Sequence, residues 1–276
     1  MRGFTILICA CVAMWAGPLG AVEISRGLLA DMAAADVVLL GEVHDNPDHH
    51  AVQAAAVAAL RPSAMVWEML SPQTAARLRA GWLDDPQHRA QGLEWAQAGW
   101  PGFDMYLPIM RAADGVPVYG GLVSREVAQA VMEQGLAVVF GSDAAEYGLM
   151  IPLSKERQAE READQARAHC DALPPDMLPL MVDVQRLRDA VLARAAVRAA
   201  GRHGGPVVVI TGNGHARTDR GVPEVLRRVR PGLRVFALGQ SEDGAIEGSF
   251  DAVVDSPAAD RPDPCAVFDR PAAGAD

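Results

Sequence analysis

The chain has 276 residues and a formal net charge of -10 at pH 7, and 50% of its residues are hydrophobic. This length and apolar content suffice for a large hydrophobic core and exclude a disordered chain. The negative charge repels phosphate backbones, and the sequence contains no local basic patch, so we expect no nucleic-acid partner.

The N-terminus is typical of a secretory signal peptide. Arg2 precedes an apolar stretch over residues 4–16, and small residues follow up to Ala21. We therefore expect export to a periplasm and a mature chain that begins at Val22. A sequence that loosely resembles a lipobox precedes Cys11, so membrane association is expected only if Cys11 is lipidated.

The rest of the chain alternates strand and helix patterns. Short apolar runs rich in β-branched residues predict strands at 36–40, 65–67, 116–119, 207–211, 234–238 and 251–254. Helices are predicted at 47–60, from 125 onward, and at 155–167, 177–200 and 223–228, and residues 71–104 are expected to form a Trp-rich helical lid or insertion. This order predicts an α/β fold in which helices flank a mostly parallel sheet. We expect one domain over residues 22–255 and a Pro- and Asp-rich tail over 256–276.

Two Gly-x-x-His sequences each follow a predicted interior strand. The first is Gly41-Glu42-Val43-His44, and the second is Gly212-Asn213-Gly214-His215. Residues just beyond parallel strands lie at the carboxyl edge of the sheet, where open α/β folds bind ligands. Both imidazoles are therefore expected to face one crevice.

Carboxylates accompany these histidines at the ends of the predicted strands. Glu42, His44 and His215 would be sufficient ligands for a divalent metal with an open position, and Glu68 would be a general base or a further ligand. Alternatively, each histidine only hydrogen-bonds its neighbouring turn and the glycines only permit a positive φ. His49 and His50 follow on a predicted helix, where neighbours diverge by about 100°, so both cannot face the crevice.

Other sequence features narrow the choice. The chain has no Gly-x-Ser-x-Gly, no Walker-type loop and no Gly-x-Gly-x-x-Gly after the first strand, which disfavours serine hydrolysis, nucleotide hydrolysis and dinucleotide binding. After signal removal two cysteines remain, Cys170 and Cys265. In an oxidising compartment a single disulfide between them is favoured over free buried thiols or a thiolate metal ligand.

Residues from about Val37 to Leu226 resemble the ChaN-like haem-binding uptake proteins of the Tiki superfamily. The resemblance rests on the segments 40–46 with 49–50 and 53, 67–69, 100–101 with 106–108, 169–170, 181–190, 212–217 and 221–223. The sequence departs from the family at Leu122, where asparagine is usual.

This resemblance implies an exported haem- or iron-binding protein that takes part in haem or iron uptake and forms a homodimer when loaded. A tyrosine ligand to ferric iron is implied, for which Tyr106 and Tyr147 are the candidates, while His44, His49 and His215 would hold propionates or tune the pocket. The superfamily also contains metal-dependent peptidases and erythromycin-esterase-like enzymes. A metal-dependent hydrolase that uses Glu42, His44, Glu68 and His215 is therefore the alternative.

Overall fold

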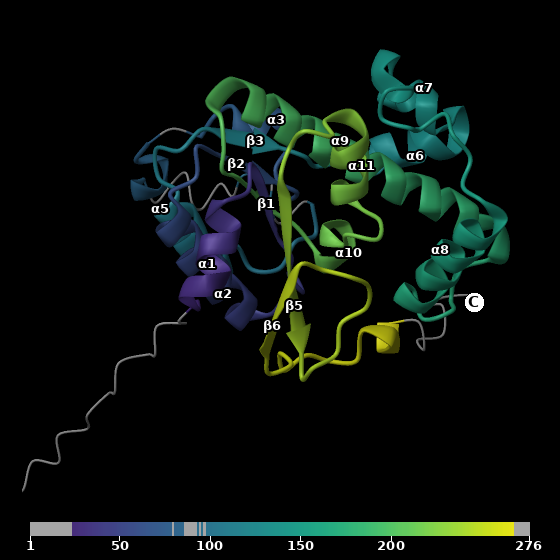
Figure 1. The fold of residues 1–276 in the computed structure, drawn as a ribbon. Coiled ribbons are helices and arrows are strands. Elements are labelled where there is room, and N and C mark those ends of the chain that lie inside the picture. The colour runs from purple at the N-terminus through teal and green to yellow at the C-terminus, as the bar shows by residue number, and fades with distance from the viewer. Residues whose placement is uncertain (1–23, 79, 86–92, 94, 96–97, 268–276) are drawn as a thin grey trace, which may run out of the picture.

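A computed structural model describes residues 24–78, 80–85, 93, 95 and 98–267. Six strands form one sheet in the order β3-β2-β4-β1-β5-β6 (Figure 1), and every pairing between these strands is parallel. The strands are β1 (Val37–Leu40), β2 (Ala64–Trp67), β3 (Val118–Gly120), β4 (Val207–Ile210), β5 (Val235–Glu242) and β6 (Ala252–Ser256). The predicted α/β fold is confirmed.

The helices surround this sheet. They are α1 (Arg26–Ala33), α2 (Pro47–Leu60), α3 (Pro72–Ala75), α5 (Leu107–Ala112), α6 (Arg125–Gln134), α7 (Leu136–Phe140), α8 (Lys155–Ala168), α9 (Leu178–His203), α10 (Asn213–Ala216) and α11 (Val222–Val229), with 3-10 turns η1 (Trp82–Asp84), η3 (Phe103–Met105), η4 (Ser142–Ala144), η5 (Pro175–Met177) and η6 (Pro264–Val267). In the described part of the chain, no helix is both long enough and apolar enough to span a membrane.

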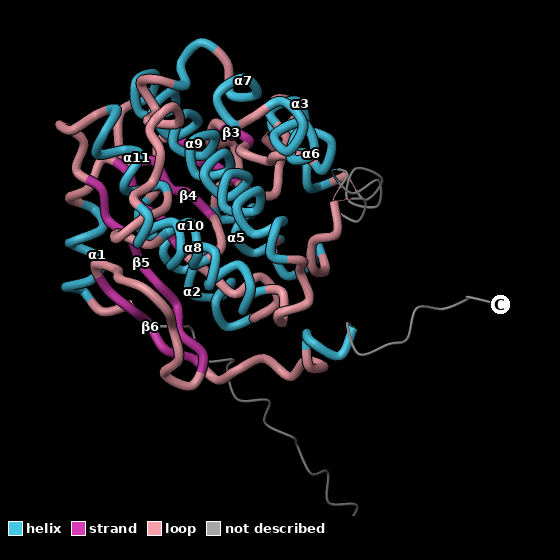
Figure 2. The backbone as a smooth tube through the Cα atoms, turned by 90° about the vertical axis from the view of Figure 1, so that its right-hand side faces the viewer, coloured by secondary structure: helices cyan, strands magenta, loops and turns pink. Residues whose placement is uncertain are grey.

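Alternate strand residues supply two hydrophobic cores, because successive side chains of a strand point to opposite faces. Val37 and Leu39 of β1 pack with α6, α7, α9 and α11, whereas Val38 and Leu40 pack with α1, α2 and α5. Figure 1 shows α1, α2 and α5 to the left of the sheet and α6, α8 and α9 to its right. The turned view of Figure 2 places α9 in front of the strands.

Two local expectations need correction. The helix expected over 71–104 is, in its described parts, only the short elements α3, η1 and η3. Gly81 and Gly99 there have φ values of 71° and 80°, a left-handed conformation that interrupts a helix. The third strand begins at Val118 rather than Val116 and has 3 residues.

The segment after β6 packs back onto the first Gly-x-x-His sequence. Arg261 forms ion pairs with Asp45 and Glu242 at 2.8 Å and 2.5 Å. Cys265 in η6 forms a disulfide with Cys170, which follows α8. The predicted pairing of these cysteines is thus present, and we name residues 257–267 the C-terminal strap.

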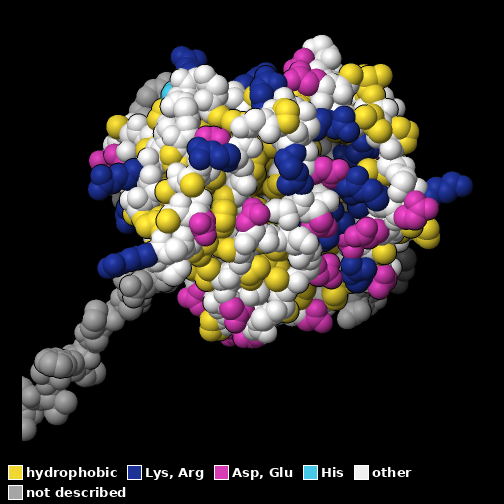
Figure 3. All heavy atoms as spheres, in the orientation of Figure 1, with side chains coloured by type: hydrophobic (Ala, Val, Ile, Leu, Met, Phe, Trp, Pro, Cys, Tyr) yellow, Lys and Arg dark blue, Asp and Glu magenta, His cyan; other side chains and the backbone are white. Residues whose placement is uncertain are grey.

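Charged side chains of both signs mix on the surface. In the face shown in Figure 3, Lys and Arg side chains alternate with Asp and Glu side chains on the right-hand side. Part of this mixture is a set of ion pairs between helices, such as Arg157 of α8 with Glu224 of α11 at 2.7 Å. This arrangement lowers the local excess of positive charge.

Candidate functional site

The register of the sheet brings the predicted site residues to one edge. Leu40 of β1 pairs with Ile210 of β4, and Ile210 pairs with Trp67 of β2. The residues that follow these strands therefore meet at the carboxyl edge. There they line a crevice of about 1510 Å³ that includes Glu42, His44, Glu68 and His215, so the expectation of one shared crevice is confirmed.

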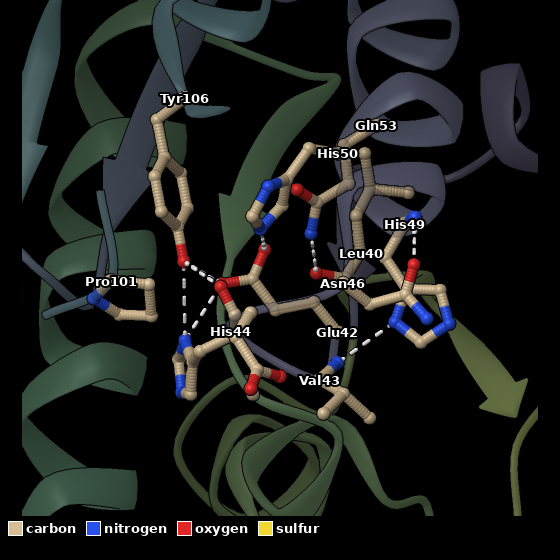
Figure 4. A network of polar contacts seen from close by, with 12 residues as sticks. Leu40, Glu42, Val43, His44, Asn46, His49, His50, Gln53, Pro101 and Tyr106 are labelled. Atoms are coloured by element: carbon tan, nitrogen blue, oxygen red, sulfur yellow. Dashed lines mark hydrogen bonds and ion pairs between the residues drawn. The ribbon is translucent and has the colours of Figure 1, made fainter. Parts of the chain in front are cut away.

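The first Gly-x-x-His sequence is held by a hydrogen-bonded cluster (Figure 4). Oε1 of the buried Glu42 lies 2.7 Å from Nδ1 of His44, and the hydroxyl of Tyr106 donates to the same oxygen at 2.7 Å. The Tyr106 hydroxyl also lies 3.1 Å from the backbone oxygen of His44. Glu42 thus fixes the His44 ring through Nδ1 and leaves Nε2 directed elsewhere.

Glu68 lies between the two motif histidines. Its Oε2 accepts hydrogen bonds from Thr211 Oγ1 at 2.6 Å and from the Gly212 backbone N–H at 2.9 Å. The same oxygen is 4.0 Å from His44 Nε2, and Oε1 is 3.4 Å from His215 Nε2. Glu68 therefore links the two Gly-x-x-His sequences through a single carboxylate.

His215 is oriented by residues of α9. Its Nδ1 lies 2.6 Å from Asp189 Oδ1 and 3.1 Å from Gln185 Nε2. Sequence reasoning gave no role to either residue of α9. Two features of the sequence could have indicated them. Gln185 and Asp189 lie one helical turn apart, and Asp189 is a carboxylate beside the apolar stripe of a helix that covers the sheet.

Gly212 lies where the two sequences touch. A Cβ added to Gly212 would lie 2.9 Å from Nε2 of His44, whereas one added to Gly214 would meet nothing closer than Gln185 Nε2 at 3.8 Å. The first glycine of the second sequence therefore permits close approach of the first histidine. The second glycine meets no such steric limit.

The electrostatics of the cluster favour paired charges. Burial opposes ionisation of Glu68, but His215, His44 and Thr211 outweigh it and hold the pKa of Glu68 well below its usual value. Burial likewise opposes protonation of His215, yet Glu68 and Asp189 raise its pKa to about 10. For Glu42 and His44 burial is again the opposing effect, and their mutual hydrogen bond lowers the pKa of Glu42 and raises that of His44.

His49, expected as a cofactor-binding residue, does not reach the crevice. Its Nδ1 accepts the Val43 backbone N–H at 2.9 Å, and its Nε2 lies 3.3 Å from the Ser241 carbonyl oxygen. The side chain is fully buried, and burial lowers its pKa. The neighbouring His50 points instead toward Glu42, with Nε2 3.4 Å from Oε2. The expected divergence of these neighbours is observed, and His49 is the one that holds the turn.

The two candidate tyrosines lie in different places. Tyr106 is fully buried; burial and then Glu42 raise its pKa far above the usual range for a phenol. Tyr147 packs in the other core, with its ring 5.0 Å from that of Phe140. Neither is among the described residues that line the crevice.

The expected metal ligands are only partly gathered. His44 and His215 approach Glu68 through Nε2, but Glu42 contacts Nδ1 of His44 on the opposite side of the ring. Within the described ranges, no three His, Cys, Asp or Glu side chains are arranged to hold a metal ion. Glu42 is therefore placed to orient His44 rather than to join it as a ligand.

Aromatic and apolar side chains form another wall of the crevice. The Trp100 ring lies 4.9 Å from that of His44, and its buried indole N–H has no hydrogen-bond partner among the residues that the structure describes. Pro101 and Val123 extend this wall. The side chain of His44 is 29% exposed, so this ring is partly accessible to a ligand that lies against this wall.

The chain is similar to a known protein family and to solved structures. A family model described as "Haem-binding uptake, Tiki superfamily, ChaN" matches residues 28–226. A solved structure described as cofacial heme binding to ChaN of Campylobacter jejuni is 19% identical, with a TM-score of 0.61 over 81% of this chain and 88% of that one. The structure of the type III effector HopBA1 is 14% identical, with a TM-score of 0.43 over 86% of this chain and 98% of that one. Among curated proteins none matches.

Proposed function

The chain belongs to the ChaN family of haem-binding uptake proteins in the Tiki superfamily, and on this basis we propose that it is an exported protein that binds haem for uptake of haem or iron. The observation that carries the proposal is the crevice at the carboxyl edge of the sheet, which both Gly-x-x-His sequences enter. Its volume of about 1510 Å³ exceeds the roughly 300–1,000 Å³ of ordinary ligand pockets. A large planar macrocycle suits such a space.

The crevice residues fit haem in their donor chemistry. His44 has Nδ1 hydrogen-bonded to Glu42, so Nε2, which lies 4.0 Å from Glu68, would be the nitrogen that binds iron; a carboxylate on the far nitrogen is the usual support of a metal-bound imidazole. Bound haem would supply a ferric or ferrous centre for storage or transfer of iron. We propose His44 as the iron ligand, because the Tyr106 hydroxyl keeps its proton and donates a buried hydrogen bond to Glu42.

Dimerisation belongs to the same proposal. The C. jejuni ChaN structure is described as binding haem cofacially, which places one macrocycle against another. A crevice that is open and larger than an ordinary pocket is compatible with two stacked macrocycles supplied by two copies of the chain. We therefore propose a homodimer in the loaded state.

Export is supported by two features at opposite ends of the chain. The N-terminal 21 residues have the pattern of a signal peptide, and the Cys170–Cys265 disulfide suits an oxidising compartment such as a periplasm. Lipidation at Cys11 would instead anchor the protein to a membrane. Mass spectrometry of the mature N-terminus distinguishes a chain that begins at Val22 from one that is lipidated at Cys11.

A haemin titration of the purified mature chain tests the binding proposal. We expect saturable binding followed by visible absorbance, and a shift to a dimer in analytical ultracentrifugation as haemin is added. His44→Ala should alter the iron-dependent bands without unfolding the protein. Absence of saturable binding by the wild-type chain would overturn the proposal.

One observation favours a second candidate, a metal-dependent hydrolase. Glu68 and the Nε2 atoms of His44 and His215 converge. Asp189 contacts Nδ1 of His215 and orients its ring, as a carboxylate orients the histidine of many hydrolytic sites. A modest rearrangement would let these groups bind a divalent cation and lower the pKa of a bound water to about 7. About one divalent metal per purified chain, lost in His215→Ala, together with no haemin binding, would favour this candidate.

A further inference from the structure

Two arginines of the crevice form no ion pair among the residues that the structure describes. Arg125 is the first residue of α6, Arg188 lies on α9, and both line the crevice. Neither forms a hydrogen bond or an ion pair with any residue that the structure describes. Arg188 is half-buried and Arg125 is exposed.

The other charges of the crevice are matched. Arg261 of the C-terminal strap also lines it but is neutralised by Asp45 and Glu242. Glu42 and Glu68 are matched by His44 and His215. In a chain of net charge -10, two arginines that line one cavity without a described ion pair mark where an anionic ligand lowers the electrostatic energy.

Glu126 is the one nearby acid that needs separate consideration. It lines the crevice next to Arg125 in the sequence, but it is exposed and forms no ion pair with Arg125 among the described contacts. Its pKa is lowered first by its hydrogen bond with Ser124. Glu126 is thus hydrogen-bonded at the start of its own helix, and its charge interaction with Arg125 is a weaker contribution to its pKa than the hydrogen bond with Ser124.

The two arginines share the crevice with an aromatic and apolar wall. Gln185, one turn from Arg188 on α9, contacts His215, so this face of α9 is turned toward the site. Trp100 and Pro101 supply the aromatic and apolar wall. An anionic ligand with an apolar body matches these two features of the lining.

We infer that Arg125 and Arg188 bind the two carboxylates of a tetrapyrrole and make the site selective for dicarboxylate porphyrins. The inference rests on the proposed haem-binding function. A guanidinium forms paired hydrogen bonds with a carboxylate. A methyl ester has no negative charge and cannot accept this pair of charge-assisted hydrogen bonds. Selectivity between acid and ester follows from these contacts and not from the iron.

The test compares haemin and iron-free protoporphyrin IX with their dimethyl esters in one detergent-containing buffer. Soret absorbance reports haemin, and quenching of tryptophan fluorescence reports the iron-free compounds. We expect the wild-type chain to bind each acid at least about tenfold more tightly than its ester. Arg188→Gln should weaken binding of the acids about tenfold, and the more exposed Arg125→Gln about threefold, with the esters unaffected.

Arg202→Gln is the matched control, because Arg202 lies on the same helix but is exposed and outside the crevice. It should bind acids and esters as the wild type does. Equal affinity of the wild type for acid and ester, or an equal loss for both in Arg188→Gln, would overturn the inference while leaving haem binding intact. No binding of any porphyrin by the wild type would overturn both.

Discussion

Tyr106 and Glu42 are joined by a buried hydrogen bond of 2.7 Å in which the phenol donates to the carboxylate. The same oxygen of Glu42 lies 2.7 Å from Nδ1 of His44. One carboxylate therefore fixes a tyrosine and a histidine that are far apart in the sequence. The phenol acts as a donor that stabilises Glu42, and Nε2 of His44 is left on the side of Glu68, 4.0 Å from its Oε2.

We expect Tyr106→Phe to destabilise the fold by about 1–3 kcal/mol, because the buried carboxylate loses a donor, while the visible spectrum of bound ferric haem stays unchanged. Chemical denaturation and absorbance spectra measure the two effects. Tyr147→Phe is the control, since this tyrosine packs against Phe140 outside the crevice. Loss of a tyrosinate charge-transfer band in Tyr106→Phe alone would show that the phenol does bind iron.

Replacing Glu42 by glutamine should weaken the support of His44. We expect haemin affinity to fall about tenfold or more, the range found when the partner of a metal-bound histidine is removed. The pKa of His44 should also fall, because its hydrogen bond with Glu42 is what raises it against burial. Proton NMR titration of the His44 ring measures this. Asp45→Asn, in the same turn but paired with Arg261, should leave the pKa of His44 nearer its wild-type value.

The two glycines of the second Gly-x-x-His sequence form a matched pair of test sites. Gly212→Ala places a methyl group 2.9 Å from His44 Nε2, so the ring must move and we expect haemin affinity to fall severalfold. In Gly214→Ala the new methyl has its nearest contact at 3.8 Å, and affinity should be unchanged. Titrations of both variants with haemin decide this. An equal effect of both substitutions would mean that the contact between residue 212 and the His44 ring does not control haemin affinity.

The charged cluster around His215 should make stability fall at alkaline pH. The folded pKa of His215 is raised to about 10, above the roughly 6.5 of an unfolded histidine. Its contribution is therefore fully present below about pH 6.5 and is lost as pH rises to about 10. Urea denaturation at several pH values measures the decline. His215→Gln should make the free energy of unfolding depend less on pH over this range. An unchanged dependence on pH in this variant would show that another group loses the proton.

The disulfide should stabilise the chain through its long loop. Cys170 and Cys265 are 95 residues apart, and closing a loop of this length restricts the unfolded chain by about 4–5 kcal/mol. We expect Cys170→Ser with Cys265→Ser to lower the free energy of unfolding by up to this amount. A reducing agent should destabilise the wild type only. Equal stability with and without the disulfide would show that the strap is held by Arg261 instead.

Much of the fold was predictable because each strand is a short apolar run next to a turn signal. The two Gly-x-x-His sequences could be placed on one edge because parallel strands share their carboxyl end. Asn46 and Pro47 likewise predicted the start of α2, where the Asn46 side chain accepts the backbone N–H of Asp48 at 2.9 Å. Local chemistry was sufficient in these cases.

The partners of the site residues were not predictable, because they depend on contacts between distant segments. Asp189 reaches His215 from another element, and Tyr106 contacts Glu42 across 64 positions of the sequence. Helical periodicity showed that His49 and His50 diverge but not which one faces Glu42. That choice depends on where α2 sits on the sheet.

The position of β1 has a consequence for synthesis. β1 is paired on one side with β4 and on the other with β5, both of which come from the last third of the chain. A nascent chain that has emerged only as far as α9 has one Gly-x-x-His sequence and no neighbour for its strand. Such long-range pairing slows folding, so the ligand-binding edge is assembled only after nearly the whole polypeptide is available, and truncated products have no crevice with which to capture a ligand.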